Sequence, residues 1–414
     1  MENYEAVSES IMAKVLCVWE QGGNFSHLSN LRVLIQILLQ QGHAVYLAAR
    51  QLHGIPAVFG DMPIHYLQAP FKQNVASASQ ASFLSYAYML QQQCFSSAEE
   101  LAIYVRVWRS MFDMIKPDMV IYEHSPTALV ASLDYTFRKV LVGNGFMCPP
   151  VTDSPFGVFP TTKQDVQTVG RLRNDDTALL QLINVAQRRM GLPVVERLAD
   201  LYAQVDCEFL QTFEELDHFD QRMASGFLGI WSLPCNVSPQ WPAGGQAKVF
   251  GYLQVFPKFE QLLQDLLAAN VSALLYVRGL PRGIRDKYSC ERLSFTDQLV
   301  DLRQVAEQAD FVVTHGNHAT LGYCMLMGIP QLAIPRYQEQ LFPVLRLQRL
   351  GCALMAYQDQ PDFQKEIGAL LQDAGFKEKA SMIKMRYEHF DVRKSEQYMA
   401  EKITELLQHL IVTV

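Results

Sequence analysis

A run of short polar residues at positions 314–320, with the letters THGNHAT, has the pattern of an anion-binding turn. It follows an apolar run at residues 311–313, which predicts a short strand buried on both faces. It precedes an apolar stripe at Leu321, Cys324 and Met325, and polar residues just before such a stripe are typical of a helix start. Because backbone N–H groups at a helix start can hold an anion, the run predicts an anion site.

The residues after this predicted helix complete a strand–helix–strand unit. The helix is expected to end at Gly328, and residues 331–335 have the apolar character of a second strand. A polar loop at residues 336–340 follows this strand and contains Glu339 and Gln340. We therefore expect the polar residues of the unit to gather at one edge of a parallel sheet.

A histidine, His27, stands at the start of another predicted helix near the N-terminus. Residues 14–19 form an apolar run suited to a central parallel strand, and a Gly-rich turn separates this run from His27. Apolar residues recur at helical spacing over residues 28–41, and a second strand is expected at residues 44–49. From these residues alone, His27 is either a reactive side chain at a strand end or a helix cap that bonds locally.

A carboxylate, Glu123, follows a predicted buried strand at residues 119–122. The carboxyl ends of strands in one sheet converge, so Glu123 and His27 are expected to meet. A carboxylate beside an imidazole fixes its tautomer and stabilises the imidazolium that forms when the ring accepts a proton. His124 is an additional candidate base, with a surface or loop histidine as the alternative.

The chain resembles the nucleotide-sugar-dependent glycosyltransferases of the GT-B fold, in the group of UDP-glucosyl and UDP-glucuronosyl transferases and bacterial antibiotic glycosyltransferases. The donor motif of that family runs T-H-G-G-x-G-T, a helix, G-V-P, a strand and P-x-x-x-D-Q. The matching residues here are Thr314 to Thr320, Gly328-Ile329-Pro330, and Pro335 to Glu339-Gln340, with no gap. The departures are Asn317 and Ala319 in place of two glycines, Glu339 in place of aspartate, and Tyr323 in place of the glutamate that contacts the ribose.

The resemblance implies roles for individual residues. His315 and Thr320 would contact the donor diphosphate, and Glu339 and Gln340 would hold sugar hydroxyls. His27 would be the catalytic base, with Glu123 as the carboxylate that orients it. The full set implied for the donor site is His315, Gly316, Asn317, His318, Thr320, Glu339 and Gln340.

The resemblance also implies an α/β fold of two Rossmann-like domains that face each other across a cleft. The βα series is interrupted by a Pro/Gly-rich stretch at residues 232–247, where a domain boundary is expected. We predict an acceptor-binding domain at 1–235, a donor-binding domain at 236–390, and a C-terminal helix at 391–414 that packs back on the first domain. An aromatic-rich patch between Phe71 and Leu90 is either an acceptor wall or ordinary core packing.

The bulk composition restricts the function classes. The chain has 414 residues, 49% hydrophobic residues and a net charge of −7, which fits a folded protein and argues against a general nucleic-acid binder. Eight cysteines are scattered without metal-ligand spacing, as expected of reduced thiols in a cytoplasmic protein. No run is long and apolar enough for a membrane span, although a peripheral membrane contact stays compatible with the sequence.

The expected function is that of an inverting, metal-independent glycosyltransferase. It would move a sugar from a UDP or dTDP sugar, as co-substrate, to a hydroxyl of an apolar or aromatic acceptor of the natural-product or glycolipid type. The alternatives are a catalytically silent sugar-nucleotide-binding or scaffold protein and a GT-B nucleotide-sugar epimerase. The acceptor, the sugar and the nucleotide base stay open.

Overall fold

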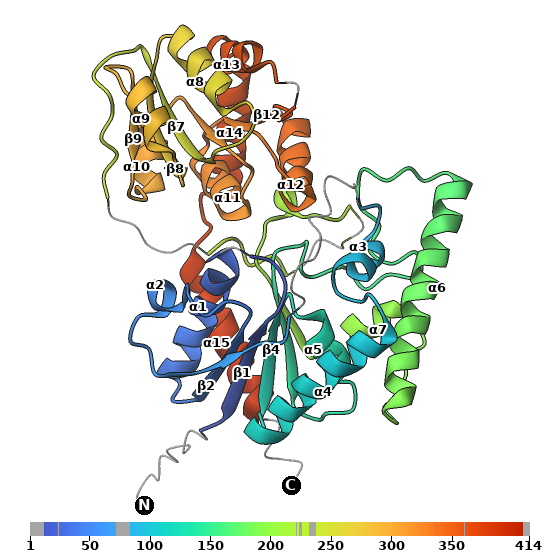
Figure 1. Ribbon diagram of the computed structural model, residues 1–414. Helices are drawn as coiled ribbons and strands as arrows, with labels where there is room; N and C mark the ends of the chain where they lie inside the picture. Colours follow the sequence, from blue (N-terminus) through green and yellow to red (C-terminus); the bar gives the residue numbers. More distant parts are fainter. Residues whose placement is uncertain are drawn as a thin grey trace, which may run out of the picture. The chain divides into compact units, whose positions relative to one another are not determined.

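The structure is a computed structural model that describes residues 12–23, 25–71, 83–220, 222, 226–231, 237–359 and 361–408 (Figure 1). The chain forms two compact units. Unit 1 comprises residues 1–211, 219–231 and 392–414, and unit 2 comprises residues 212–218 and 232–391. The predicted boundary between residues 235 and 236 lies outside the described residues.

Unit 1 is built on a six-stranded sheet in the order β3-β2-β1-β4-β5-β6, in which every neighbouring pair is parallel. The strands are β1 (Lys14–Trp19), β2 (Ala44–Ala49), β3 (Ile64–Gln68), β4 (Met119–Glu123), β5 (Arg138–Gly143) and β6 (Cys207–Leu210). The helices are α1 (Phe25–Gln40), α2 (Ile55–Phe59), α3 (Tyr86–Gln93), α4 (Ala98–Ile115), α5 (Pro126–Ala131), α6 (Val166–Arg189), α7 (Leu198–Ala203) and α15 (Val392–Gln408).

Helix α1 shows why this sequence forms a layered α/β unit. Its residues Leu31, Leu34, Ile35 and Leu38 recur at helical spacing and are fully buried against the sheet. The helix is followed by Gly42, whose φ of 81° lies in the left-handed region that favours glycine. The chain can therefore turn sharply into β2.

The last helix, α15, packs on α1 within unit 1. Its residues Met399, Ile403 and Leu406 belong to the same apolar core as the α1 residues (Figure 1). Gln41, just after α1, donates hydrogen bonds from Nε2 to the Ala400 carbonyl and to the Thr404 hydroxyl at 3.0 and 3.1 Å. The apolar face of α15 is thus covered by the first helix of unit 1.

Unit 2 contains a second six-stranded parallel sheet in the order β12-β11-β10-β7-β8-β9. Its strands are β7 (Ala247–Gln254), β8 (Val271–Arg278), β9 (Leu293–Thr296), β10 (Phe311–Thr314), β11 (Gln331–Ala333) and β12 (Ala353–Met355). Its helices are α8 (Phe259–Ala268), α9 (Arg282–Tyr288), α10 (Leu302–Gln308), α11 (His318–Met327), α12 (Gln338–Arg349), α13 (Phe363–Gln372) and α14 (Gly375–Arg386), with the 3-10 turn η1 (Glu214–Leu216).

The segment 212–218, which follows β6 of unit 1, folds as part of unit 2. The buried carboxylate of Glu215 accepts hydrogen bonds from Arg386 and Tyr387 at the end of α14. Phe213 packs edge-on against the rings of Tyr387 and Phe390. An ion pair and an aromatic cluster therefore fix this segment to α14.

The predicted α/β class is confirmed, and β1 and β2 have the bounds that the apolar patterns predict. The expected polar loop at 336–340 is wrong in part, because α12 already begins at Gln338 and places Glu339 and Gln340 in its first turn. In the aromatic-rich patch, Tyr86, Met89 and Leu90 are buried, as ordinary core packing requires. Among the described residues, no helix has the length and hydropathy of a membrane span.

Candidate active site

In unit 1, His27 and Glu123 lie at the point where the strand order reverses. Strand β1 pairs with β2 on one side and with β4 on the other, and a crevice forms at the carboxyl ends of the strands at such a point. His27 lies in the first turn of α1, the helix that follows β1 in the chain, and Glu123 is the last residue of β4, opposite Trp19. The strand ends thus bring together two side chains 96 residues apart.

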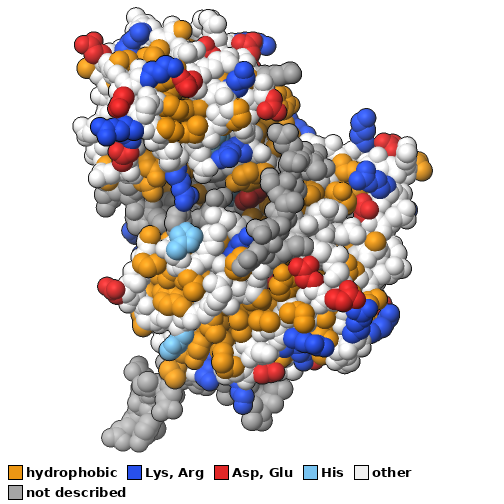
Figure 2. Space-filling model, in the orientation of Figure 1, with side chains coloured by type: hydrophobic (Ala, Val, Ile, Leu, Met, Phe, Trp, Pro, Cys, Tyr) orange, Lys and Arg blue, Asp and Glu red, His pale blue; other side chains and the backbone are white. Residues whose placement is uncertain are grey.

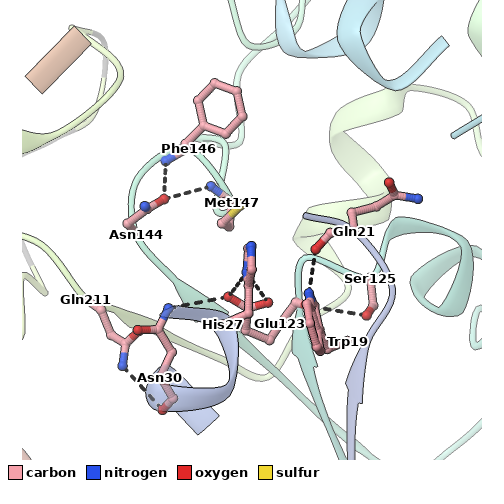
Figure 3. A network of polar contacts seen from close by, with 10 residues as sticks. All are labelled: Trp19, Gln21, His27, Asn30, Glu123, Ser125, Asn144, Phe146, Met147 and Gln211. Carbon is pink, nitrogen blue, oxygen red and sulfur yellow. Dashed lines mark hydrogen bonds and ion pairs between the residues drawn. The ribbon is translucent and has the colours of Figure 1, made fainter. Parts of the chain in front are cut away.

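The imidazole of His27 is hydrogen-bonded to the carboxylate of Glu123 (Figure 3). Nδ1 of His27 lies 2.7 Å from Oε1 and 2.8 Å from Oε2, and the two residues are 4% and 0% exposed. Asn30 adds a longer hydrogen bond from Nδ2 to Oε1 of Glu123 at 3.4 Å. A carboxylate can only accept here, so Nδ1 carries the proton and Nε2 carries the lone pair. This is the tautomer that a base acting through Nε2 needs.

The ring of His27 is held from three directions. The Trp19 ring stacks on the imidazole of His27, with ring centroids 5.3 Å apart. The His124 ring also stacks on this imidazole, with ring centroids 6.2 Å apart. Gly22 approaches Nε2 so closely that it has no room for a side chain. Packing and the Glu123 contact together define the ring position, which is the preorganisation that general base catalysis requires.

His124, the other candidate base, lies in the loop after β4 and is buried, so it is the loop histidine of the alternative and does not lie on the surface. Burial, with the nearby His27, lowers the pKa of His124 to about 3. A group with this pKa is neutral at pH 7 but is a weak proton acceptor. Its φ of 41° is unusual for a residue other than glycine, and such strain clusters at functional sites. His124 is therefore better suited to packing on His27 than to replacing it.

A second buried carboxyl group, Glu20, follows β1 directly. It accepts hydrogen bonds from the backbone N–H and the hydroxyl of Thr127 and from the Trp108 indole. Burial raises the pKa of Glu20 to about 7, against the lowering effect of these donors and of Arg50. These hydrogen bonds connect the end of β1 to α4 and α5.

Unit 2 has a corresponding point of strand reversal between β7 and β10. Gln254 is the last residue of β7, and His315 directly follows β10. Nδ1 of His315 lies 2.9 Å from the Ile334 carbonyl, and Nε2 lies 2.9 Å from the backbone N–H of Gln254. Nδ1 donates to Ile334, so Nε2 has no proton and accepts the Gln254 N–H. Burial lowers the pKa of His315, which favours this neutral form.

His315 therefore joins three strand ends in this structure. A phosphate contact through Nε2 would require that nitrogen to be protonated and to release the Gln254 N–H. The predicted diphosphate role of His315 thus stays a prediction, and its observed contacts are with backbone. Gln254 is the last residue of a strand at the reversal point, and this position is the signal that could have identified it from the sequence.

The turn after β10 has the expected helix start. Gly316 has a φ of 82°, and a Cβ atom there would lie 2.8 Å from the Val344 side chain of α12. Asn317 is the N-cap of α11, and Thr320 is buried in the first turn. The first N–H groups of a helix have no intrahelical partner, so the start of α11 can hold an anion.

The Gln340 side chain joins this turn to the start of α12. Its Oε1 accepts the backbone N–H of Arg336 at 2.9 Å, and its Nε2 donates to Oδ1 of Asn317 at 2.7 Å. Gln340 is only 4% exposed. The two residues from the motif that the sequence predicts for donor binding are therefore in direct contact with each other.

Glu339 and His318 meet a residue that sequence reasoning missed. His218, which is fully buried, lies with Nε2 2.8 Å from the backbone carbonyl of Glu339. Its ring is 5.4 Å from the His318 ring. No sequence pattern signals this contact, because residues 212–218 follow a strand of unit 1. The structure thus gathers the predicted donor residues in unit 2 and the predicted catalytic pair in unit 1.

The described residues carry charged side chains of both signs. On the face in Figure 2, their basic and acidic side chains are interspersed without an extended basic area. Within the described ranges, no group of three or more His, Cys, Asp or Glu side chains is arranged to hold a metal ion.

No family model matches the chain, and no curated protein matches its sequence. Solved structures do match over nearly the whole length. A glycotransferase of kitacinnamycin superposes with a TM-score of 0.67 at 15% identity, covering 95% of this chain and 99% of that chain. The glycosyltransferase VinC, in complex with dTDP, has a TM-score of 0.61 at 16% identity, with 95% and 98% coverage. The spinosyn rhamnosyltransferase SpnG, complexed with spinosyn aglycone, has a TM-score of 0.56 at 16% identity, with 95% and 100% coverage. The chain therefore has the GT-B fold of these glycosyltransferases, as its sequence motifs predict.

Proposed function

We propose that this protein is a glycosyltransferase that moves a sugar from a nucleoside-diphosphate sugar to a hydroxyl group of an acceptor. The observation that carries the proposal is the buried His27–Glu123 pair at the strand reversal of unit 1, in a chain with the GT-B fold. A fold alone supports many functions, whereas a histidine with its tautomer fixed by a carboxylate is suited to proton abstraction.

In the proposed reaction, Nε2 of His27 accepts the proton of the acceptor hydroxyl while the acceptor oxygen bonds to the anomeric carbon. The bond from that carbon to the diphosphate oxygen breaks with both electrons on the oxygen, so one displacement inverts the configuration. Glu123 stabilises the imidazolium that forms, because its carboxylate lies 2.7 Å from Nδ1. Asn30 holds the carboxylate in turn.

The donor is proposed to bind in unit 2. The start of α11, with Thr320 in its first turn, offers N–H groups and the positive end of a helix dipole to the diphosphate. This arrangement supports a leaving group stabilised by protein dipoles, hence a metal-independent reaction. Glu339 and Gln340, with Gly316, Asn317 and His318, complete the proposed donor site, and His315 positions the strand ends around it.

The structural neighbours support the ligand classes. VinC is described in complex with dTDP, and SpnG in complex with spinosyn aglycone. We propose a UDP or dTDP sugar as the donor and an apolar or aromatic small molecule as the acceptor. The resemblance in the donor motif supports the same assignment.

Product analysis tests the proposal. Purified protein is incubated with UDP and dTDP hexoses and a panel of aromatic and polyketide-type hydroxyl acceptors, and products are read by mass spectrometry. A hexose-bearing acceptor supports the proposal. A changed free sugar nucleotide would indicate an epimerase, and nucleotide binding without turnover over the whole panel would indicate a silent binding protein. Either of these two results overturns it.

A further inference from the structure

The hydrogen bond between Asn317 and Gln340 has an orientation that the surrounding backbone determines. The N–H of Arg336 can only donate, so the atom of Gln340 that faces it at 2.9 Å is Oε1. Nε2 of Gln340 then faces Asn317, which must present Oδ1 at 2.7 Å. The amide of Gln340 is thus used at both ends within unit 2.

Asn317 does not have the role that its position favours. Asparagine is among the strongly preferred N-cap residues because its side chain accepts a backbone N–H of the first turn. Asn317 is the N-cap of α11, yet among the described residues its side chain makes no cap hydrogen bond and bonds to Gln340 instead. The Asn317 side chain therefore accepts no N–H group from the first turn of α11, and these groups can bind another acceptor. Its Oδ1 accepts the hydrogen bond from Gln340 instead.

We infer that Asn317 is a specificity-determining residue of the donor site, because it holds Gln340 and a donor sugar has to compete with it for that amide. The inference rests on the proposed function, in which Gln340 faces the sugar. Gln340 is only 4% exposed, so a sugar hydroxyl gains little from it while the bond to Asn317 is intact. At this position the related donor motif has glycine, which has no side chain that could hold a glutamine amide.

The inference predicts a change in selectivity when the Asn317 amide is removed. In Asn317→Ala and Asn317→Gly, Gln340 is released for sugar hydroxyls, whereas binding of a bare diphosphate does not involve Gln340. The affinity ratio of UDP-glucose to UDP, and of dTDP-glucose to dTDP, should therefore rise about 5- to 10-fold, the effect of one hydrogen bond worth about 1 kcal/mol. Changes in phosphate binding cancel in this ratio.

A double-mutant cycle with Gln340→Ala tests the assignment by titration calorimetry of the full chain. In the parent, Gln340→Ala should leave the ratio within about twofold, and in the Asn317→Ala background it should abolish the gained preference. The inference is overturned if Asn317→Ala and Asn317→Gly keep the parental ratio, or if Gln340→Ala lowers the ratio about tenfold in the parent. If the parent binds none of the four nucleotides, the proposed function fails instead.

Discussion

Gly22 and His27 approach each other so closely that a Cβ atom on Gly22 would lie 2.0 Å from Nε2 of His27. Heavy atoms do not come nearer to a Cβ atom than about 3 Å without a shift, because their van der Waals radii overlap. The φ of Gly22 is 85°, a value that residues with a side chain rarely adopt. The position of the imidazole therefore depends on glycine at residue 22.

Gly22→Ala should displace the His27 ring and separate Nδ1 from Glu123. We expect turnover to fall by roughly 10²- to 10⁴-fold, the usual contribution of a positioned base. The positive φ adds a stability cost of about 1–3 kcal/mol. Initial rates of sugar transfer and thermal unfolding measure the two effects separately.

Gly23→Ala is the matched control, because a Cβ atom on Gly23 meets no atom of the described residues within 4 Å. It should keep the parental rate. If both alanine variants lost the same activity, the contact between Gly22 and the imidazole would not be the cause.

His27→Ala should remove the base and lower turnover by roughly 10²- to 10⁴-fold. Donor affinity, measured by calorimetry, should stay near the parental value because the residues proposed to bind the donor belong to unit 2. Transfer at the parental rate by His27→Ala would show that the base is another residue.

Glu123→Gln should also lower turnover, because a glutamine can donate to Nδ1 and thereby move the imidazole proton to Nε2. The ring would then have the wrong tautomer for a base, the effect described for the aspartate-to-asparagine change in serine proteases. The pH–rate profile distinguishes this loss from unfolding. An unchanged rate would mean that Glu123 does not orient the ring.

The contact between His27 and Glu123 could be predicted from the sequence for a physical reason. Strands β1 and β4 are continuous apolar runs, so the sequence shows where each strand ends. The carboxyl ends of parallel strands lie at the same edge of a sheet. Glu123 at the end of one run, and His27 after the short turn that follows the other, are then candidates for contact. The resemblance to a known family supplied their roles.

The contacts within the proposed donor site could not be predicted in the same way. His218 lies 121 residues before Glu339, and the segment that carries it follows a strand of unit 1 but folds with unit 2. Edge strands such as β3 and β12 were missed because β3 is mostly exposed and β12 has three residues. Periodicity reports which face of an element is buried, and it carries no information on the partner.

Glu20 makes stability depend on pH. Its pKa is raised by burial from 4.5 in the unfolded chain to about 7 in the folded protein. The folded state therefore favours the protonated form, and this contribution is complete below pH 4.5 and is lost as the pH rises through 7. It amounts to about 3 kcal/mol at most, since one pKa unit corresponds to about 1.4 kcal/mol. Chemical denaturation between pH 4 and 8 measures it.

Glu20→Gln is the reference variant for this measurement, because it is neutral at every pH. In this variant an amide N–H group faces the Trp108 indole N–H, which in the parent donates to the Glu20 carboxyl group. We therefore expect the free energy of unfolding to fall by about 1–3 kcal/mol at every pH. The stability of the parent relative to the variant should fall as the pH rises from 4.5 to 7. A difference that is independent of pH would contradict the raised pKa.

His218 should position the start of α12 for donor binding. Its Nε2–H donates to the Glu339 carbonyl at 2.8 Å, and the residue is fully buried. His218→Leu would remove the donor and leave that carbonyl without this partner. We expect the donor KM to rise by about 5- to 10-fold, since one lost hydrogen bond costs about 1 kcal/mol. The kcat should change little, because His27 and Glu123 belong to unit 1.

His218→Gln is the matched variant for the same measurement, because a glutamine amide places an N–H donor at nearly the same distance from the backbone as Nε2 of histidine. It should restore the donor KM to within about twofold of the parent, whereas His218→Leu should not. Thermal unfolding of both variants separates positioning from stability. If the two variants lost stability equally and kept the parental donor KM, His218 would serve only to fix residues 212–218 to unit 2.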